Sequence, residues 1–331
     1  RYSFIGTEPE SVISTGHGYP DGEVDPLSLV ESMMSNYVLV DNGKLPKFCG
    51  GVVGYLSYEV VKYFEDLPTA AEDFLEIPES MLFLTKTFLI FDHVRHKIQV
   101  VSHGHIDGDV DEAYDLAISN IERIVRRLNK PLDPKKIPRS SGYKSGEISS
   151  NMLPEYHREM VDKSKEYIVN GDVIQVVVSQ RFARPTSAHP FHIYRSLRAI
   201  NPSPYMYYLD LGDFQIVGAS PEMLVRVNNG IIETHPIAGT RPRSSDEQED
   251  KRLEHELKSD EKERAEHLML VDLGRNDVGR AAVFDSVHVK EFMIVEYYSH
   301  VMHIVSDIRG RLQDGKDVFD ALYSGFPAGT L

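Results

Sequence analysis

Two glutamates three residues apart, Glu263 and Glu266, lie where a heavily charged run of the sequence becomes apolar. At helical spacing they share one face. Two carboxylates that enter a partly buried zone disfavour each other's charged form unless a cation compensates. Mg²⁺ needs only one or two carboxylates, because waters and substrate oxygens complete its shell. The pair therefore indicates either half of a magnesium site or ordinary surface carboxylates.

The segment "SPEMLVRVNNGIIETHPIAGT" predicts a hairpin that brings an acid to a turn of small residues. The Asn-Gly pair at 229–230 favours a two-residue type I′ turn, because both positions accept positive φ. In that register Asn228 faces Ile231, and Glu222 lies opposite Ile237 at the start of "IAGT". The alternative is an edge hairpin with a solvated Glu222.

A polar amide interrupts an apolar run at residues 172–179, "DVIQVVVS". The run predicts a buried strand in which Gln175 points the same way as Val173 and Val177. Burying an amide costs free energy unless it is hydrogen-bonded. Gln175 is therefore either a structural glutamine with its bonds made inside the protein or a ligand-facing one.

Two histidines, His300 and His303, suggest a zinc site at first sight. The β-rich run "MIVEYYSHVMHIVS" instead predicts one strand, in which residues three apart face opposite sides. No cysteine or third histidine is placed to help, which argues against zinc. One of the two histidines either orients a substrate oxygen in a cleft or is a satisfied core residue.

The surrounding pattern predicts the elements that position these groups. Residues up to about 103 alternate strand-like runs with Gly, Pro and Asp, which indicates a sheet-rich region. An amphipathic helix over 111–130 follows, then a linker at 131–150 and a helix from Pro154 to a stop at Gly171. The helix at 111–130 is expected to bury one face, made of Tyr114, Ala117, Ile121, Val125 and Leu128. Beyond the hairpin, with a break near Ser259-Asp260, the predicted apolar stripe is Leu253, Leu257, Ala265, Leu268 and Val271.

Composition excludes several classes of protein. The 331 residues are enough for roughly two domains, and the net charge of −15 gives no global field that attracts nucleic acid or an anionic membrane. The single cysteine excludes an internal disulfide framework, and no apolar run is long enough for a membrane helix. We expect a soluble, cytoplasmic protein whose two ends read as cut.

Several motifs, in this order, resemble the chorismate-utilising enzymes, and most closely the anthranilate synthase component I family. They are "RYSFIG", "GGVVGYLSYE", "DVIQVVVSQRF", "NPSPYMYYLD", "GASPE", "HPIAGTRPR", "AEHLMLVDLGRND", "YSHVMHIVS" and "FPAGTL". The resemblance runs through nearly the whole chain. It implies an α+β fold of the aminodeoxychorismate (ADC) synthase-like type, with two layered α/β subdomains and a substrate cleft between sheets. The implied division is an N-terminal subdomain over 1–130, the linker at 131–150 and a chorismate-binding catalytic domain over 151–331.

The reaction implied by the resemblance adds ammonia to C2 of chorismate with loss of the C4 hydroxyl. Elimination of pyruvate then leaves anthranilate, a step toward tryptophan. The resemblance also implies Mg²⁺ as cofactor, a glutamine amidotransferase subunit (component II) as the source of ammonia, and feedback inhibition by tryptophan.

Site roles follow from the motif positions. The resemblance makes Glu222 the general acid and His303 the histidine beside the substrate ring. It makes Glu266 the first magnesium carboxylate and Glu263 the neighbour that holds metal-bound water. The implied substrate-side residues are Gln175, Ala238, Gly239, Thr240 and Thr330, and the implied tryptophan site is Asn201, Pro202, Ser203, Pro204, Tyr205 and Met206.

Two positions separate relatives that share this scaffold. Isochorismate and salicylate synthases carry a lysine where this chain has Gln175, and an amide is a poor general base for activating water. ADC synthases typically read "PIKGT", with a lysine nucleophile where this chain has Ala238. Ser244 departs from the glycine that usually follows "RPR", a difference that touches none of the proposed chemistry.

The resemblance also implies segments beyond both ends of the chain, among them the second metal carboxylate and further substrate residues. The polypeptide as printed is therefore expected to be inactive. Two alternatives remain: an ADC synthase-like enzyme, and a non-catalytic regulatory subunit that binds tryptophan and an amidotransferase. Having Glu222, Glu266 and His303 together argues against the second alternative.

Overall fold

A computed structural model describes residues 1–331 except 41–42, 44, 69–72, 74, 134–141 and 330–331. The chain divides into two compact units, Arg1–Ile137 and Pro138–Leu331. The linker predicted at 131–150 lies across this boundary. Each unit has its own sheets and is described by itself.

The first unit is rich in antiparallel strands, as the sequence predicted for the residues up to 103. Its strands order β1-β5-β6 in one sheet and β2-β4-β3 in another. Phe88, Ile90 and Val101 form a buried cluster in the first of these sheets. Its elements are β1 (Tyr2–Gly6), β2 (Ser11–Thr15), α1 (Pro26–Met34), β3 (Gly51–Leu56), the 3₁₀ helix η1 (Tyr58–Tyr63), β4 (Ser80–Thr85), β5 (Thr87–Asp92), β6 (Lys97–Ser102) and α2 (Val110–Leu128).

Helix α2 forms where it was predicted, but it buries a different face. Asp109 caps its N-terminus by accepting from the backbone N–H groups of Asp111 and Glu112. The buried side chains are Ala117 and Ile124, whereas the predicted Tyr114, Val125 and Leu128 are exposed. The buried stripe is thus rotated by about one residue, because packing against β6 fixes the face and periodicity alone does not.

The second unit carries most of the predicted site. Its elements are β7 (Ser149–Ser150), α3 (Pro154–Asn170), β8 (Phe182–Ala183), α4 (Pro190–Ile200), β9 (Tyr205–Asp210), β10 (Gln215–Ser220), β11 (Arg226–Asn228), β12 (Ile231–Thr234), β13 (Ile237–Pro242), α5 (Glu247–Ser259), α6 (Glu261–Ala281), β14 (His288–Tyr297), β15 (Val301–Arg311) and α7 (Val318–Gly325). Among the described residues of both units, no helix is long and apolar enough to cross a membrane.

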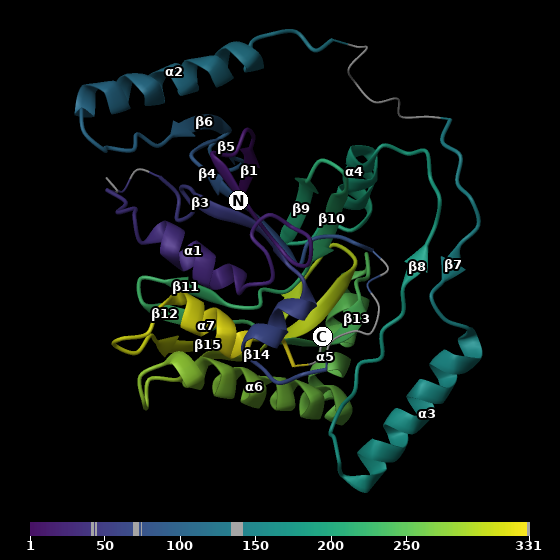
Figure 1. Ribbon diagram of the computed structural model, residues 1–331. Coiled ribbons are helices and arrows are strands. Elements are labelled where there is room, and N and C mark those ends of the chain that lie inside the picture. The colour runs from purple at the N-terminus through teal and green to yellow at the C-terminus, as the bar shows by residue number, and fades with distance from the viewer. Residues whose placement is uncertain (41–42, 44, 69–72, 74, 134–141, 330–331) are drawn as a thin grey trace. The chain divides into compact units, whose positions relative to one another are not determined.

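Strand β15 organises the larger sheet of this unit. It pairs antiparallel with β12 and β13 along one edge and with β14 along the other. Helix α6 packs across β15, with α7 beside it (Figure 1). The buried cluster between them consists of Ile232, Val271, Val278, Ala281, Ala282, Ile308 and Ala321. The sheet and α6 therefore share one core, and the position of α6 is fixed by it.

The predicted hairpin has the predicted register. Asn228 pairs with Ile231, and both Asn229 and Gly230 have positive φ, as a type I′ turn requires. The strand ladder ends before Glu222, whose side chain nevertheless reaches the backbone of the turn segment.

Helices α5 and α6 meet at Asp260, so the predicted break is confirmed. The predicted apolar stripe is correct at Leu257 and Val271 but wrong at Ala265, which is exposed, and at Leu268, which is 54% exposed. On α6 the buried face instead runs through His267, Val271, Gly274, Val278 and Ala281. A hydrophobic pattern could not predict His267 on this face, because histidine is not counted as an apolar residue.

Two strand predictions were wrong. Helix α3 begins at Pro154 and stops at the left-handed Gly171, as predicted, but the run at 172–179 forms no strand. Ile174 is 80% exposed, and within the described residues no other strand pairs with this run. A strand forms only where a neighbour satisfies its N–H and C=O groups. The single strand predicted around His300 and His303 is in fact β14 and β15, with His300 in the turn between them.

Candidate active site

The "PIAGT" turn is a bulge in β13. Ala238 pairs with Ile304 and Thr240 pairs with His303, and the register shifts between these pairs at Gly239. Bulges bend a strand and redirect its side chains, and they are common beside active sites. The bulge places Ala238, which is buried, next to the residues that approach from the sheet and from α6.

Gly239 makes room for a carboxylate. Its φ of 72° is left-handed. A Cβ at this position would stand 3.0 Å from Leu257 Cδ1 and 3.2 Å from Glu263 Oε2. Both the backbone conformation and the close approach require glycine. The turn and the first turn of α6 are therefore in direct contact.

Glu222 reaches the same turn from the other side. Its Oε1 accepts the backbone N–H of Ile237 at 3.3 Å. Ser220 holds the segment, since its hydroxyl accepts the N–H of Glu222 and donates to the carbonyl of Glu222. Burial raises the pKa of Glu222 above its usual range, and the hydrogen bond from Ile237 offsets only part of that rise. A carboxyl in this state is suited to donate a proton near neutral pH.

His303 faces the turn from β15. Its Nδ1 lies 3.1 Å from the carbonyl oxygen of Gly239 and 3.0 Å from the hydroxyl of Thr240. Because a carbonyl oxygen only accepts, we assign the ring proton to Nδ1. Nε2 then carries the basic lone pair. The ring of Tyr298 packs edge-on at 5.4 Å between centroids and fixes the plane of the imidazole.

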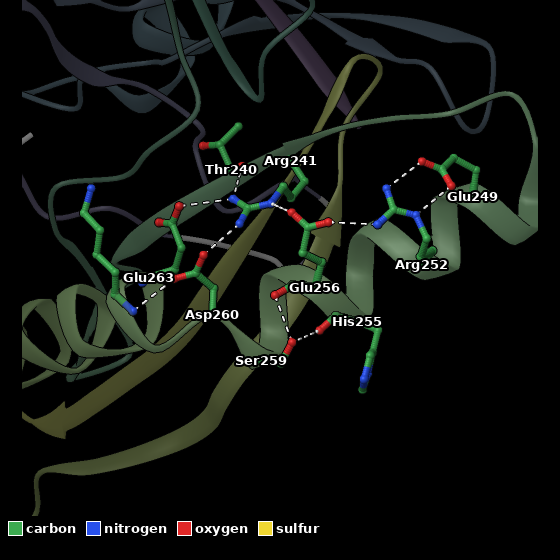
Figure 2. Close-up of polar contacts among 10 residues, drawn as sticks. Thr240, Arg241, Glu249, Arg252, His255, Glu256, Ser259, Asp260 and Glu263 are labelled. Carbon is green, nitrogen blue, oxygen red and sulfur yellow. Dashed lines mark hydrogen bonds and ion pairs between the residues drawn. The ribbon is translucent and has the colours of Figure 1, made fainter.

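Glu263 is held by Arg241, which follows the turn on β13. The guanidinium of Arg241 also contacts Glu256 and Asp260, so three carboxylates from α5, α6 and their junction surround it (Figure 2). Arg241 Nη1 lies 3.1 Å from Glu263 Oε1. Asp260 additionally caps α6 by accepting the N–H groups of Lys262 and Glu263. The arginine thus connects the turn to the start of the helix that carries both predicted metal carboxylates.

Glu266 lies one turn further along α6 and is half-buried. Within the described residues it makes no hydrogen bond or ion pair, so its carboxylate is available to a cation. Across the same residues, no group of three or more His, Cys, Asp or Glu side chains forms a complete metal cage. This donor set fits Mg²⁺, which retains waters and binds through one or two carboxylates plus substrate oxygens.

Other predicted residues lie apart from this cluster or outside the described residues. Gln175 is on the largely exposed run after α3, and the structure does not bring it to the turn through any strand pairing. Thr330 lies outside the described residues. Among the residues predicted for tryptophan, Tyr205 and Met206 begin β9 and pair with Ser220 and Ala219. The other four, Asn201, Pro202, Ser203 and Pro204, link α4 to β9.

Comparison with known proteins gives the family. The family model described as chorismate binding enzyme matches residues 2–331. The chain belongs to the chorismate-binding enzyme family. It is 44% identical over 345 residues to anthranilate synthase component 1 of Acetivibrio thermocellus, covering all of this chain and 70% of that protein. It is 38% identical over 343 residues to aminodeoxychorismate synthase component 1 of Bacillus subtilis, covering all of this chain and 71% of that protein.

A solved structure agrees with the predicted α+β fold. The crystal structure of anthranilate synthase component I from Streptococcus pneumoniae TIGR4 has a TM-score of 0.87 and 36% identity to this chain. The match covers 99% of this chain and 73% of that one. The predicted fold class and the family resemblance are therefore confirmed.

Sequence reasoning missed two sets of residues that shape this cluster. The sequence analysis assigned no role to the cluster in which Arg241 meets Glu256 and Asp260. His267, fully buried, has its Nε2 2.7 Å from the Ser306 hydroxyl and ties α6 to β15. Burial lowers the pKa of His267 to about 4, so the ring is neutral at physiological pH. The only available signal was a histidine at a position in phase with Val271 and Val278.

Proposed function

We propose that this chain is the chorismate-converting component of an anthranilate synthase. It takes chorismate and ammonia and releases anthranilate and pyruvate. One observation carries the proposal: a partly buried acid, Glu222, accepts the backbone N–H of Ile237 in the bulged turn, and the next residue, Ala238, has no nucleophile. The similarity to proteins named anthranilate synthase component 1 supports it.

Glu222 acts as the general acid. Loss of the C4 hydroxyl requires a proton on the departing oxygen, and hydroxide itself is a poor leaving group. The raised pKa of Glu222 keeps a larger fraction of the carboxyl protonated near neutral pH. Transfer of this proton allows water to leave as ammonia bonds to C2.

His303 acts as the base of the second step. Removal of the C2 proton, with cleavage of the bond from C3 to the enolpyruvyl oxygen, makes the ring aromatic and releases pyruvate. With Nδ1 bonded to the Gly239 carbonyl, Nε2 is the atom that accepts the proton. Thr240 shares the Nδ1 proton and restrains the ring.

Ala238 decides between the two amination routes. A lysine at this position would supply an amine that attacks C2 itself, whereas alanine leaves C2 open to free ammonia. This favours the anthranilate route over the ADC synthase-like alternative, although a protein with that name is also similar to this chain.

Mg²⁺ is the proposed cofactor, with Glu266 on α6 as its protein carboxylate and Glu263 as the neighbour that holds metal-bound water. When bound, it neutralises substrate carboxylate charge and orients the ring. Gly239 and Thr240 contribute backbone groups on the substrate side. The enzyme is a lyase in this proposal.

A glutamine amidotransferase subunit is the proposed partner, because the similar proteins are named as component 1 of their enzymes. Tryptophan is the proposed inhibitor, bound at 201–206. The pairing of Met206 with Ala219, three residues before Glu222, places that segment beside the acid-bearing strand end.

Anthranilate fluorescence tests the proposed function. The full-length protein, given chorismate, ammonium and Mg²⁺, is expected to produce fluorescent anthranilate and an equal amount of pyruvate. A folded protein that forms no anthranilate would refute the proposal, and formation of 4-amino-4-deoxychorismate would favour the alternative enzyme. Ala238→Lys is expected to lower the rate or change the product, and an unchanged outcome would remove Ala238 from the substrate side.

A further inference from the structure

The two carboxylates that α6 presents at the site have different partners. Glu263 is engaged on one oxygen by Arg241 Nη1, at 3.1 Å, and its other oxygen lies against Gly239. Glu266 has no hydrogen bond or ion pair in the part of the chain that the structure describes. Of these two acids, Glu266 is therefore the more available to a cation.

Arg241 is held too firmly to move aside easily. Its side chain is 17% exposed and donates four hydrogen bonds: to Glu256, Asp260, Glu263 and the Thr240 carbonyl (Figure 2). Each carboxylate meets a different nitrogen of the planar guanidinium, at 2.9 to 3.1 Å. A lysine ammonium, on its flexible stem, cannot reproduce this three-way geometry.

Arg241 does not cancel the charge around it. One guanidinium faces three carboxylates, so the cluster remains net negative and still attracts a cation. Removing the arginine frees an oxygen of Glu263 and takes a positive charge away from the same place. Both changes favour cation binding.

We propose that Arg241 is a positioning residue that competes with the divalent cation for Glu263 and leaves Glu266 as the carboxylate that binds the cation. This inference rests on the magnesium site of the proposed function. As a consequence, the native site binds the cation more weakly than the same site would without Arg241. The arginine also holds Glu263 in one orientation against the turn.

Binding of Mn²⁺ alone, followed by the electron paramagnetic resonance signal of the free ion, tests the inference. Arg241→Gln is expected to bind Mn²⁺ about tenfold more tightly than the wild type. The gain should disappear in the double variant Arg241→Gln with Glu263→Gln. In the wild-type background, Glu263→Gln should change Mn²⁺ affinity little, and Glu266→Gln should remove most of the binding.

A matched control is Arg252→Gln. Arg252 bonds Glu256 from the other side and also pairs with Glu249, but it does not touch α6 (Figure 2). Its loss should leave Mn²⁺ affinity unchanged. Arg241→Lys keeps the positive charge but loses the planar guanidinium, so it should tighten Mn²⁺ binding less than Arg241→Gln does. Circular dichroism checks that each variant is folded.

Weaker Mn²⁺ binding by folded Arg241→Gln would overturn the inference, and so would a Glu263→Gln effect of equal size in both backgrounds. A purely structural role for Arg241 predicts one of these two results. The readout is independent of anthranilate formation. If the fluorescence assay fails while the Mn²⁺ ranking holds, the proposed reaction is wrong and the role of Arg241 stands.

Discussion

Strand β15 and the run at 172–179 are both rich in β-branched residues, yet they have opposite environments. Ile308 on β15 is fully buried, between α6 and the sheet, whereas Ile174 is 80% exposed. Strands flank β15 on both edges, while the described residues offer the other run no strand partner. Apolar composition thus indicates a possible strand, and the pairing partner decides whether it forms.

The comparison extends to chemistry. The side chains that meet at the bulged turn lie on or beside strands and helices that pack against β15 and α6. Gln175 lies on the largely exposed run, which pairs with no strand among the described residues. Substitutions in the two regions should therefore differ in size in a predictable order.

Loss of the acid Glu222 should have the largest effect. Glu222→Gln keeps the shape but cannot donate a proton, so kcat should fall roughly a thousandfold while chorismate binding is retained. Steady-state kinetics and equilibrium binding check this. The matched control is Glu166→Gln, because Glu166 is an exposed glutamate on α3; this change should leave kcat unchanged. Loss of chorismate binding in Glu222→Gln would indicate a structural role instead.

Truncation of the central core residue should come next. Ile308→Ala removes a fully buried side chain and should lower the free energy of unfolding by about 2 to 5 kcal/mol. Urea denaturation followed by circular dichroism measures the loss. A change under 1 kcal/mol would mean that α6 does not depend on this contact.

A smaller effect should appear in the pH dependence of stability. The pKa of Glu222 is raised in the folded state, so the folded protein holds this proton more tightly than the unfolded chain does. The contribution of Glu222 to stability is therefore greatest below its ordinary pKa of 4.5 and is lost as pH rises through the raised value. Between pH 5 and pH 8, the urea concentration at the midpoint of unfolding should fall further for the wild type than for Glu222→Gln. Equal losses in the two proteins would contradict a raised pKa of Glu222 in the folded state.

Ile174→Ala should have the smallest effect. The side chain is largely solvated, and its removal should change the unfolding free energy by less than about 0.5 kcal/mol. The same urea experiment as for Ile308→Ala makes the pair directly comparable. A loss as large as that of Ile308→Ala would show that the run at 172–179 is covered in solution, and the contrast between the two regions would fail.

Local chemistry explains what the sequence could predict. The Asn-Gly turn defines its own register, Gly171 ends its helix, and Asp260 separates two helices, because each depends on neighbours within a few residues. These signals were enough to predict that Glu222 and the turn lie close together.

Distant partners explain what the sequence could not predict. The face of α2 depends on β6, and the three carboxylates around Arg241 meet because α5 and α6, joined at Asp260, both pack against β13. His267 occupies a core position in which its Nε2 meets the Ser306 hydroxyl on β15, while its Nδ1 has no hydrogen-bond partner among the described residues. None of these partners follows from periodicity.

The central place of β15 has a consequence for the order of folding. The β11–β12 hairpin closes across two residues, and isolated hairpins form within about 1 to 10 μs. The pairing of β12 and β13 with β15 must wait for a strand that lies beyond α5 and α6 in the chain, and such non-local closure is slow. During synthesis the acid and the turn therefore emerge first, and the imidazole of His303 completes the site only when β15 is made.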